Sequence, residues 1–203
     1  MYLTVYPNSI NSKHIQQAVQ VLEKGGLLIY PTDTVYAIGC LSTQQQALKK
    51  LAKLKAVKLE KANFSFLFED ISGLSQYLKP MDTATFRLLN RLLPGPYTFI
   101  LPAHPRILKP FNKRKALGIR ITAHPVLQEL LPLLSAPLIT TSLHDEDQIK
   151  DYTTDPEEIY EKWESEIDVM LACGAGGNTP STVVDLTGGE AVILREGKGT
   201  FPL

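Results

Sequence analysis

Hydrophobic positions along the chain follow two alternating patterns. Short apolar runs typical of β-strands are separated by segments whose apolar residues recur every three or four positions, as in amphipathic helices. The strand-like runs lie at 2–6, 27–31, 35–40, 63–68, 97–102, 117–122, 137–142, 167–174, 181–186 and 191–197. The helical segments lie at 12–26, 43–55, 82–95, 124–134 and 155–165.

Capping residues mark the ends of several predicted helices. We expect Ser12 to cap the first helix and Gly25 to end it. Asp82 is the expected cap of the third helix, and Asp155 followed by Pro156 begins the last one. Because strands and helices interleave throughout, the sequence predicts an α/β (α+β) fold. In it, residues 1–203 form a single domain with a twisted mixed β-sheet flanked by helices.

The composition is that of an ordinary soluble protein, with 44% hydrophobic and 21% charged residues. No apolar run approaches the roughly 18 residues that a membrane helix needs, and the N-terminal residues lack a secretory pattern. The two cysteines, Cys40 and Cys173, lack metal-binding spacing and lie in apolar surroundings, so we expect buried, reduced thiols. Together these features predict a cytoplasmic protein without a membrane partner.

The net charge is zero, yet the charge is unevenly distributed. Residues 49–120 hold 15 Lys and Arg against 4 Asp and Glu, whereas residues 121–203 hold 4 against 15. Such asymmetry favours a basic surface that binds an anion. The alternative is that the two regions neutralise each other in the fold.

A polar segment, 31–34, interrupts two apolar runs that look like buried strands. It contains two threonines and an aspartate, and small hydroxyls gather again at 140–142 and 181–182, where other strand-like runs end or begin. Hydroxyls at strand ends can line a polar pocket. Taken singly, each is more often a turn residue.

Six lysines fall between residues 49 and 61, at the end of a predicted helix and in the loop that follows. They indicate either a solvated basic helix end or a phosphate site built from point charges. Arg120 and Arg195 each end a strand-like run and are candidates to complete such a site.

Common catalytic motifs are missing from the sequence. It has no Walker A loop, nucleophile elbow or H-E-x-x-H motif, and its four histidines have no ligand spacing, so we expect no protein metal site. The segment "CGAGGNTPST" at 173–182 is glycine-rich, which permits close backbone approach, but it precedes a strand rather than opening a helix. A hydrolase or reductase with an unrelated pocket is therefore disfavoured.

Five segments occur in a familiar order: "YPTDTVYAIGC", "LPGPYTFIL", "GIRITAHPV", "LITTS" and "PSTVVDLTGGEAVILREG". In this the chain resembles the YrdC/YciO family of threonylcarbamoyl-adenylate synthase-like proteins over roughly residues 10–200, and most closely the YciO-like branch. The resemblance implies a concave basic surface that binds nucleotides and double-stranded RNA, including tRNA. The family's synthases join L-threonine, bicarbonate and ATP into threonylcarbamoyl-AMP for tRNA modification, releasing pyrophosphate. ATP would bring Mg²⁺.

The resemblance also implies roles for individual residues. Thr34 matches a threonine-contacting hydroxyl, Arg120 matches the arginine that pairs with the amino-acid carboxylate, and Thr140 and Ser181 line the same pocket. Lys55 matches the first residue of a K-x-R phosphate signature. The remaining positions expected near the nucleotide and its phosphates are Lys58, Lys61, Ser142 and Arg195.

Three departures from the synthases affect the expected activity. Val57 replaces the arginine of K-x-R, His144 replaces the asparagine of a later S-x-N, and Phe66 stands where a histidine usually contacts threonine. An apolar side chain cannot replace a planar bidentate cation, although Lys58 could serve as a point charge. We therefore favour a YciO-like nucleotide- and double-stranded-RNA-binding protein; the alternative is an active nucleotidyltransferase, the L-threonylcarbamoyladenylate synthase.

Overall fold

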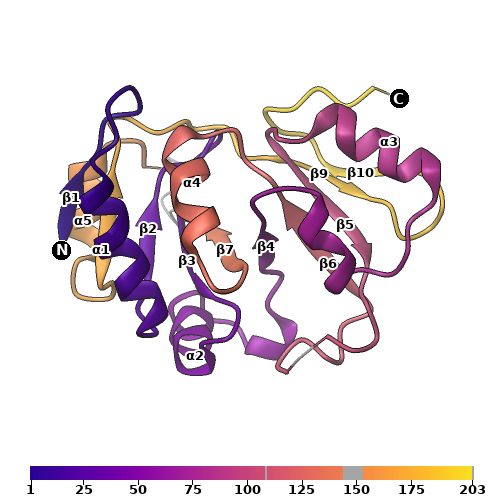
Figure 1. The fold of residues 1–203 in the computed structure, drawn as a ribbon, viewed down its shortest axis with the longest axis horizontal. Coiled ribbons are helices and arrows are strands. Elements are labelled where there is room, and N and C mark those ends of the chain that lie inside the picture. Colours follow the sequence, from indigo (N-terminus) through magenta and orange to yellow (C-terminus); the bar gives the residue numbers. More distant parts are fainter. Residues whose placement is uncertain (108, 144–152, 203) are drawn as a thin grey trace.

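The computed structural model describes residues 1–107, 109–143 and 153–202. Within these residues, ten strands form one mixed sheet in the order β1-β8-β2-β3-β7-β4-β6-β5-β9-β10 (Figure 1). The strands are β1 (Tyr2–Thr4), β2 (Leu28–Tyr30), β3 (Ala37–Leu41), β4 (Ser65–Leu67), β5 (Tyr97–Pro102), β6 (Ala116–Arg120), β7 (Leu138–Ser142), β8 (Val169–Ala172), β9 (Thr182–Asp185) and β10 (Val192–Arg195). The mixed sheet predicted from the sequence is confirmed.

Five α-helices and three short 3₁₀ helices flank the sheet in the described residues. The α-helices are α1 (Ser12–Glu23), α2 (Gln45–Leu54), α3 (Thr83–Leu92), α4 (Pro125–Leu130) and α5 (Pro156–Trp163). The 3₁₀ helices are η1 (Leu59–Lys61), η2 (Ser72–Gln76) and η3 (Leu131–Leu133). Figure 1 shows α1 and α4 together toward one end of the sheet and α3 at the other end, beside β5, β9 and β10.

The caps of α3 and α5 are confirmed, but that of α1 is shifted by one residue. Asp82 accepts a hydrogen bond from the Thr85 backbone N–H, and Asp155 accepts from the first turn of α5. The cap of α1 is Asn11, whose side chain accepts from Lys13 N, because residue 11 is the one with extended backbone. Gly25 follows α1 with φ +83°, a conformation that favours glycine.

Each face of the sheet has its own apolar cluster. On one face, α1 and α4 pack against alternate residues of β2, β3, β7 and β8, which include Leu28, Leu41 and Leu138. On the other face, helices α2, α3 and α5 contribute to a larger cluster that includes Ile139 and Phe99. The register pairs Leu67 of β4 with Leu138 of β7, so the α1–α4 cluster reaches the middle of the sheet.

Candidate functional site

The candidate site occupies the part of the α1–α4 face that the α1–α4 cluster does not reach. Along β7 and β4, the apolar pair of Leu138 and Leu67 gives way two residues away to the paired Thr140 and Ser65. Side chains two apart on a strand share a face, so the covered surface continues directly into a polar one. A cavity of about 530 Å³ lies there. Its lining includes Thr34, Asn63, Ser65, Thr98, Arg114, Gly118, Arg120, Thr140, Ser142, Ser181 and Arg195.

The polar segment 31–34 forms a tight hydroxyl-bonded turn at one wall. Thr32 Oγ1 donates to the Val35 carbonyl at 2.7 Å and accepts from the Thr34 backbone N–H at 3.0 Å. The two hydroxyl oxygens of Thr32 and Thr34 lie 2.9 Å apart. Because Thr32 has already donated its only hydroxyl proton, Thr34 must be the donor in that contact. One lone pair of Thr34 Oγ1 accepts from Arg120 Nη2, so toward the cavity Thr34 presents the other, which can accept from a hydroxyl or an ammonium group.

Arg120 is the buried cation of the site, with 7% of its surface exposed. Its Nη2 donates to Thr34 Oγ1 at 3.1 Å and to Asp33 Oδ1 at 3.0 Å. Its Nε has no hydrogen-bond partner among the residues that the structure describes. Burial lowers the pKa of Arg120 and the Asp33 carboxylate opposes that shift, so the guanidinium stays charged. A buried guanidinium in the wall of a cavity is suited to pairing with a carboxylate.

Two further hydroxyl pairs line the cavity. Tyr30 donates to Thr140 Oγ1 at 2.6 Å, and burial raises the pKa of the Tyr30 phenol. On the opposite wall, Thr98 Oγ1 and Ser181 Oγ lie 2.8 Å apart. Arg195 donates to the Ser181 carbonyl from Nε and Nη2, at 3.1 and 2.8 Å, and Nη2 also reaches Ser181 Oγ at 3.2 Å. Arg195 is thus held at the rim, next to the hydroxyl pair.

The lysines predicted for phosphate binding divide into two groups. Lys55 Nζ donates to the Ser142 carbonyl at 3.3 Å, which places its ammonium at the edge of the cavity. Lys58 and Lys61 are exposed and do not line the cavity. Val57, at the position of the synthases' arginine, is 41% exposed. His144 lies outside the described residues.

The glycine-rich segment 173–182 lies against the polar turn at 31–34, and it makes the close backbone approach that its glycines permit. A Cβ at Gly177 would lie 2.0 Å from the Thr34 carbonyl oxygen, so only glycine permits this approach. Tyr36 fixes the same segment: its hydroxyl donates to the Gly174 carbonyl at 2.8 Å and accepts from the Cys173 N–H at 2.9 Å. Burial raises the pKa of Tyr36 to about 12, so its hydroxyl stays protonated and can donate. These contacts hold Thr34 facing the cavity.

Sequence reasoning missed several residues of the site. Asp33 was given no role in the site, yet it pairs with Arg120, and its carbonyl accepts from Lys198 Nζ at 2.6 Å. Thr98 and Arg114 also line the cavity, and Arg114 donates to the carbonyls of Leu59 and Ala62. Thr98 lies in an apolar run with no nearby sequence signal, whereas the basic run at 113–115 could have indicated Arg114.

Phe66 lies away from the cavity, on the opposite face of the sheet. Its ring packs edge-on against Phe111, with centroids 4.9 Å apart, and contacts Phe68 and Tyr77. Strand alternation explains this position, because it is Ser65 that faces the cavity. The expectation that residue 66 lies at a threonine contact is therefore wrong for this chain.

The two cysteines differ in burial. Cys40 is buried, and its environment raises the pKa of the thiol to about 12. Cys173 is only partly buried, because it begins the glycine-rich segment rather than continuing β8. Among the described residues, no group of three or more His, Cys, Asp and Glu side chains could hold a metal ion. Within the same residues, no helix is long and apolar enough to cross a membrane.

Comparison with known proteins shows which family this chain resembles. A family model described as "Telomere recombination", which covers Sua5, YciO and YrdC, matches residues 20–197. The chain belongs to the Sua5/YciO/YrdC family. Within that family, the chain is 35% identical over 201 residues to YciO of Escherichia coli, covering 98% of this chain and 96% of that protein. It is 30% identical over 185 residues to a threonylcarbamoyl-AMP synthase of Pseudomonas aeruginosa, covering 90% and 98% of the two chains.

Solved structures of the Sua5/YciO/YrdC family have the same fold. The crystal structure of E. coli YciO matches with a TM-score of 0.89 at 34% identity, over 98% of this chain and 97% of the other. P. abyssi Sua5, crystallised in complex with L-threonine, matches with a TM-score of 0.86 at 24% identity, over 97% of this chain and 57% of that protein. The fold and the family predicted from the sequence are thus confirmed.

Proposed function

We propose that the chain is a YciO-like protein that binds a nucleotide and double-stranded RNA, with a cavity for an ATP- and threonine-type ligand pair. One observation carries this proposal. Six residues that are far apart in the sequence, and that were predicted to contact threonine or the nucleotide, line one cavity of about 530 Å³. That volume lies within the roughly 300–1,000 Å³ typical of small-molecule sites. They are Thr34, Arg120, Thr140, Ser142, Ser181 and Arg195.

The cavity divides into two parts by charge. The buried Arg120 and the remaining lone pair of Thr34 suit the carboxylate and the amine or hydroxyl of an amino acid such as L-threonine. Arg195 and Lys55, at the rim, suit phosphate groups. In this proposal Mg²⁺ enters with ATP and is held by phosphate and water oxygens, as is usual for this ion.

The lining favours binding and positioning over proton transfer. Among the described residues that line the cavity there is no histidine and no carboxylate. An adenylate-forming reaction in such a site would rely on holding the reactants in line and on offsetting phosphate charge. Compared with the synthases, this chain has one cation fewer for that purpose, because Val57 stands in place of their arginine, at a position that is 41% exposed. The loss of one such donor costs on the order of 2.7–4 kcal/mol of transition-state stabilisation.

RNA binding is proposed for the basic region 49–120. Lys49, Lys50 and Lys53 on α2 are exposed, as are Lys58 and Lys61 after it. If these lysines contact RNA phosphates, affinity must fall by about 0.7–0.9 log unit per contacted phosphate for each tenfold rise in salt. Filter binding of a short RNA duplex across salt concentrations measures that slope. A flat dependence would contradict the electrostatic part of the proposal.

An active threonylcarbamoyl-AMP synthase is the second candidate. The similarity to the P. aeruginosa synthase and the position of Lys55 at the edge of the cavity favour it. If the chain is a synthase, it should release pyrophosphate only when L-threonine, bicarbonate and ATP are all present.

One experiment distinguishes the two candidates. ATP, L-threonine and RNA binding are followed by thermal shift, since any ligand of the native state raises the melting temperature. Pyrophosphate release is measured in parallel for the native chain and for Val57→Arg. We expect binding without threonine-dependent release in the native chain, and release in Val57→Arg but not in Val192→Arg, which adds an arginine at another exposed valine. Threonine-dependent release by the native chain would establish the synthase, and absence of any ligand shift would contradict both candidates.

A further inference from the structure

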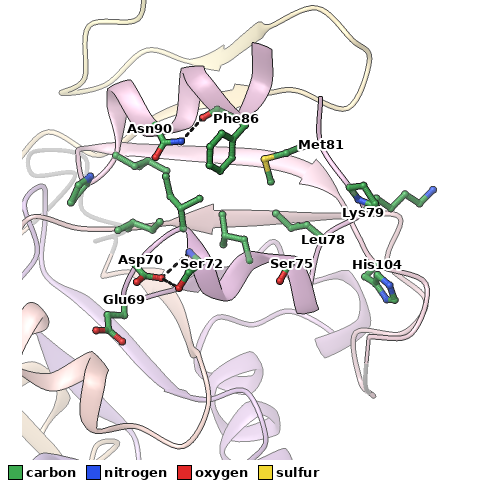
Figure 2. A pocket seen from close by; sticks show the side chains of 16 residues that line it. Glu69, Asp70, Ser72, Ser75, Leu78, Lys79, Met81, Phe86, Asn90 and His104 are labelled. Carbon is green, nitrogen blue, oxygen red and sulfur yellow. Dashed lines mark hydrogen bonds between the residues drawn. The ribbon is translucent and has the colours of Figure 1, made fainter. Parts of the chain in front are cut away.

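A second cavity lies on the opposite face of the sheet, between η2 and α3 (Figure 2). It has a volume of about 780 Å³, and none of the described residues lines both cavities. Its walls are mostly apolar and include Leu74, Leu78, Met81, Phe86, Leu93 and Ile121. Volume and lining are those of a small-molecule site.

Phe86 marks the unfilled part of this apolar cavity. Its side chain extends from α3 into the gap toward η2 (Figure 2), yet 46% of its surface stays exposed. By contrast, Leu74, Leu78 and Ile121 on the other walls are at most 2% exposed. An apolar group between these walls would bury the ring of Phe86 without displacing the core.

The polar residues of the apolar cavity are separated by charge. Figure 2 shows Lys79 and His104 at one end and Glu69 and Asp70 at the other. Two backbone hydrogen bonds hold the residues of the basic end in place. Lys79 N donates to the Pro102 carbonyl at 2.9 Å, and His104 N donates to the Tyr77 carbonyl at 2.8 Å.

His104 is arranged to act as a donor even when its ring is neutral. Its Nδ1 accepts the backbone N–H of Arg106 at 3.1 Å, so the ring proton resides on Nε2. Figure 2 shows the Lys79 side chain directed outward at this end, where its flexible stem can bring the ammonium to an anionic head group beside the imidazole N–H. The carboxylates of Glu69 and Asp70 repel such a head from the far end and leave that end to the apolar tail.

We propose that the apolar cavity binds a free single-chain carboxylic acid. The alkyl chain lies between Leu78 and Phe86, and the carboxylate lies between Lys79 and His104. The proposal does not rest on the function proposed for the first cavity, hereafter the polar cavity, because the two cavities have separate walls.

Isothermal titration with octanoate, decanoate and dodecanoate, each below its micelle concentration, tests this directly. Each added methylene should raise the affinity about fourfold, since burying one is worth about 0.8 kcal/mol. Decan-1-ol and decyltrimethylammonium should bind at least about tenfold more weakly than decanoate, because the alcohol carries no charge to pair with Lys79 and the quaternary ammonium cannot accept a hydrogen bond. Absence of decanoate binding, or equal binding of the cationic amphiphile, would overturn the proposal.

Matched variants locate the site. Phe86→Glu should abolish decanoate binding, whereas Tyr6→Glu, at another exposed aromatic residue, should leave it unchanged. Lys79→Gln should weaken decanoate binding about tenfold and leave decan-1-ol binding unchanged, with Lys113→Gln as the charge-matched control. Decanoate binding that both Phe86→Glu and Lys79→Gln leave intact would also overturn the proposal.

A protein partner is the alternative occupant. An amphipathic peptide helix could also lie between η2 and α3. A titration of a Leu- and Lys-rich helical peptide that gives Phe86-dependent heat, where decanoate gives none, would replace the ligand proposal with a partner surface.

Discussion

The two halves of one sheet face differ in what their strands present. Under α1 and α4, β7 and β4 present Leu138 and Leu67, and both side chains are almost completely buried. Two residues along, the same strands present Thr140 and Ser65 to the polar cavity. The backbone geometry continues unchanged, so the division between core and site is made by side chains alone. One half of this face therefore contributes stability, and the other contributes binding chemistry.

The largest effect should come from the covered half. Leu138→Ala removes a fully buried side chain and should lower the free energy of unfolding by about 2–5 kcal/mol. Ser65→Ala, on the neighbouring strand in the open half, should change it by no more than about 0.5 kcal/mol. Urea denaturation of both variants measures the contrast. Equal losses would show that the open half also belongs to the cooperative core.

Thr140→Val should have an intermediate effect on stability, because it lies where the two halves meet. It leaves the buried Tyr30 hydroxyl without its partner, which costs about 1–3 kcal/mol. Removing that hydroxyl as well, in Tyr30→Phe/Thr140→Val, should cost less than the sum of the single changes. A double-mutant cycle from denaturation curves tests this, and strict additivity would mean that the 2.6 Å contact contributes no stability.

Thr34→Val tests the open half through binding rather than stability. The variant keeps the side-chain volume but removes the acceptor that faces Arg120, so affinity for L-threonine should fall about five- to tenfold. The free energy of unfolding should fall by about 1–3 kcal/mol, because one buried Arg120 N–H loses its partner, and the chain should stay folded. Calorimetric titration in the presence of ATP measures the affinity, with the exposed Thr43→Val as control. Unfolding of Thr34→Val would assign the polar turn a purely structural role.

His124 gives the smallest expected effect, at the start of α4. Burial lowers its pKa below the ordinary value of 6.5, with Asp33 opposing the shift. The unfolded chain then binds this proton more readily, so the stability contributed by neutral His124 is complete above pH 6.5 and is lost as pH falls below it. Between pH 7 and pH 5, the melting temperature of His124→Asn should therefore fall less than that of the native chain. Parallel losses would show that His124 titrates alike in both states.

Local signals in the sequence were enough to predict most of the fold. Helix caps depend on a few adjacent residues, and Asp82 and Asp155 were predicted correctly. The cap of α1 was misplaced from Asn11 to Ser12, because both residues can cap and only the backbone of residue 11 is extended. The order of strands in the sheet is set by distant pairings, which periodicity does not contain.

The sequence was enough to predict which hydroxyl and arginine residues line the candidate site, but not which residues they contact. Thr34 stood out because a polar segment interrupted two apolar runs. The ion pair of Asp33 with Arg120 spans 87 positions and could not be read from either neighbourhood. Phe66 was misplaced because matching a family position does not fix which face of β4 the residue takes. The apolar cavity gave no sequence signal, since its walls look like ordinary core residues.

The end of β6 separates the two cavities by a single peptide unit. Arg120 lines the polar cavity, and the next residue, Ile121, lines the apolar one. If a ligand in either cavity changes the affinity of the other, thermodynamic linkage requires the change to be mutual and equal in free energy. Titrating L-threonine with and without decanoate, and decanoate with and without L-threonine, must therefore give the same ratio of affinities. One strand end thus makes two chemically unrelated ligands potential effectors of each other.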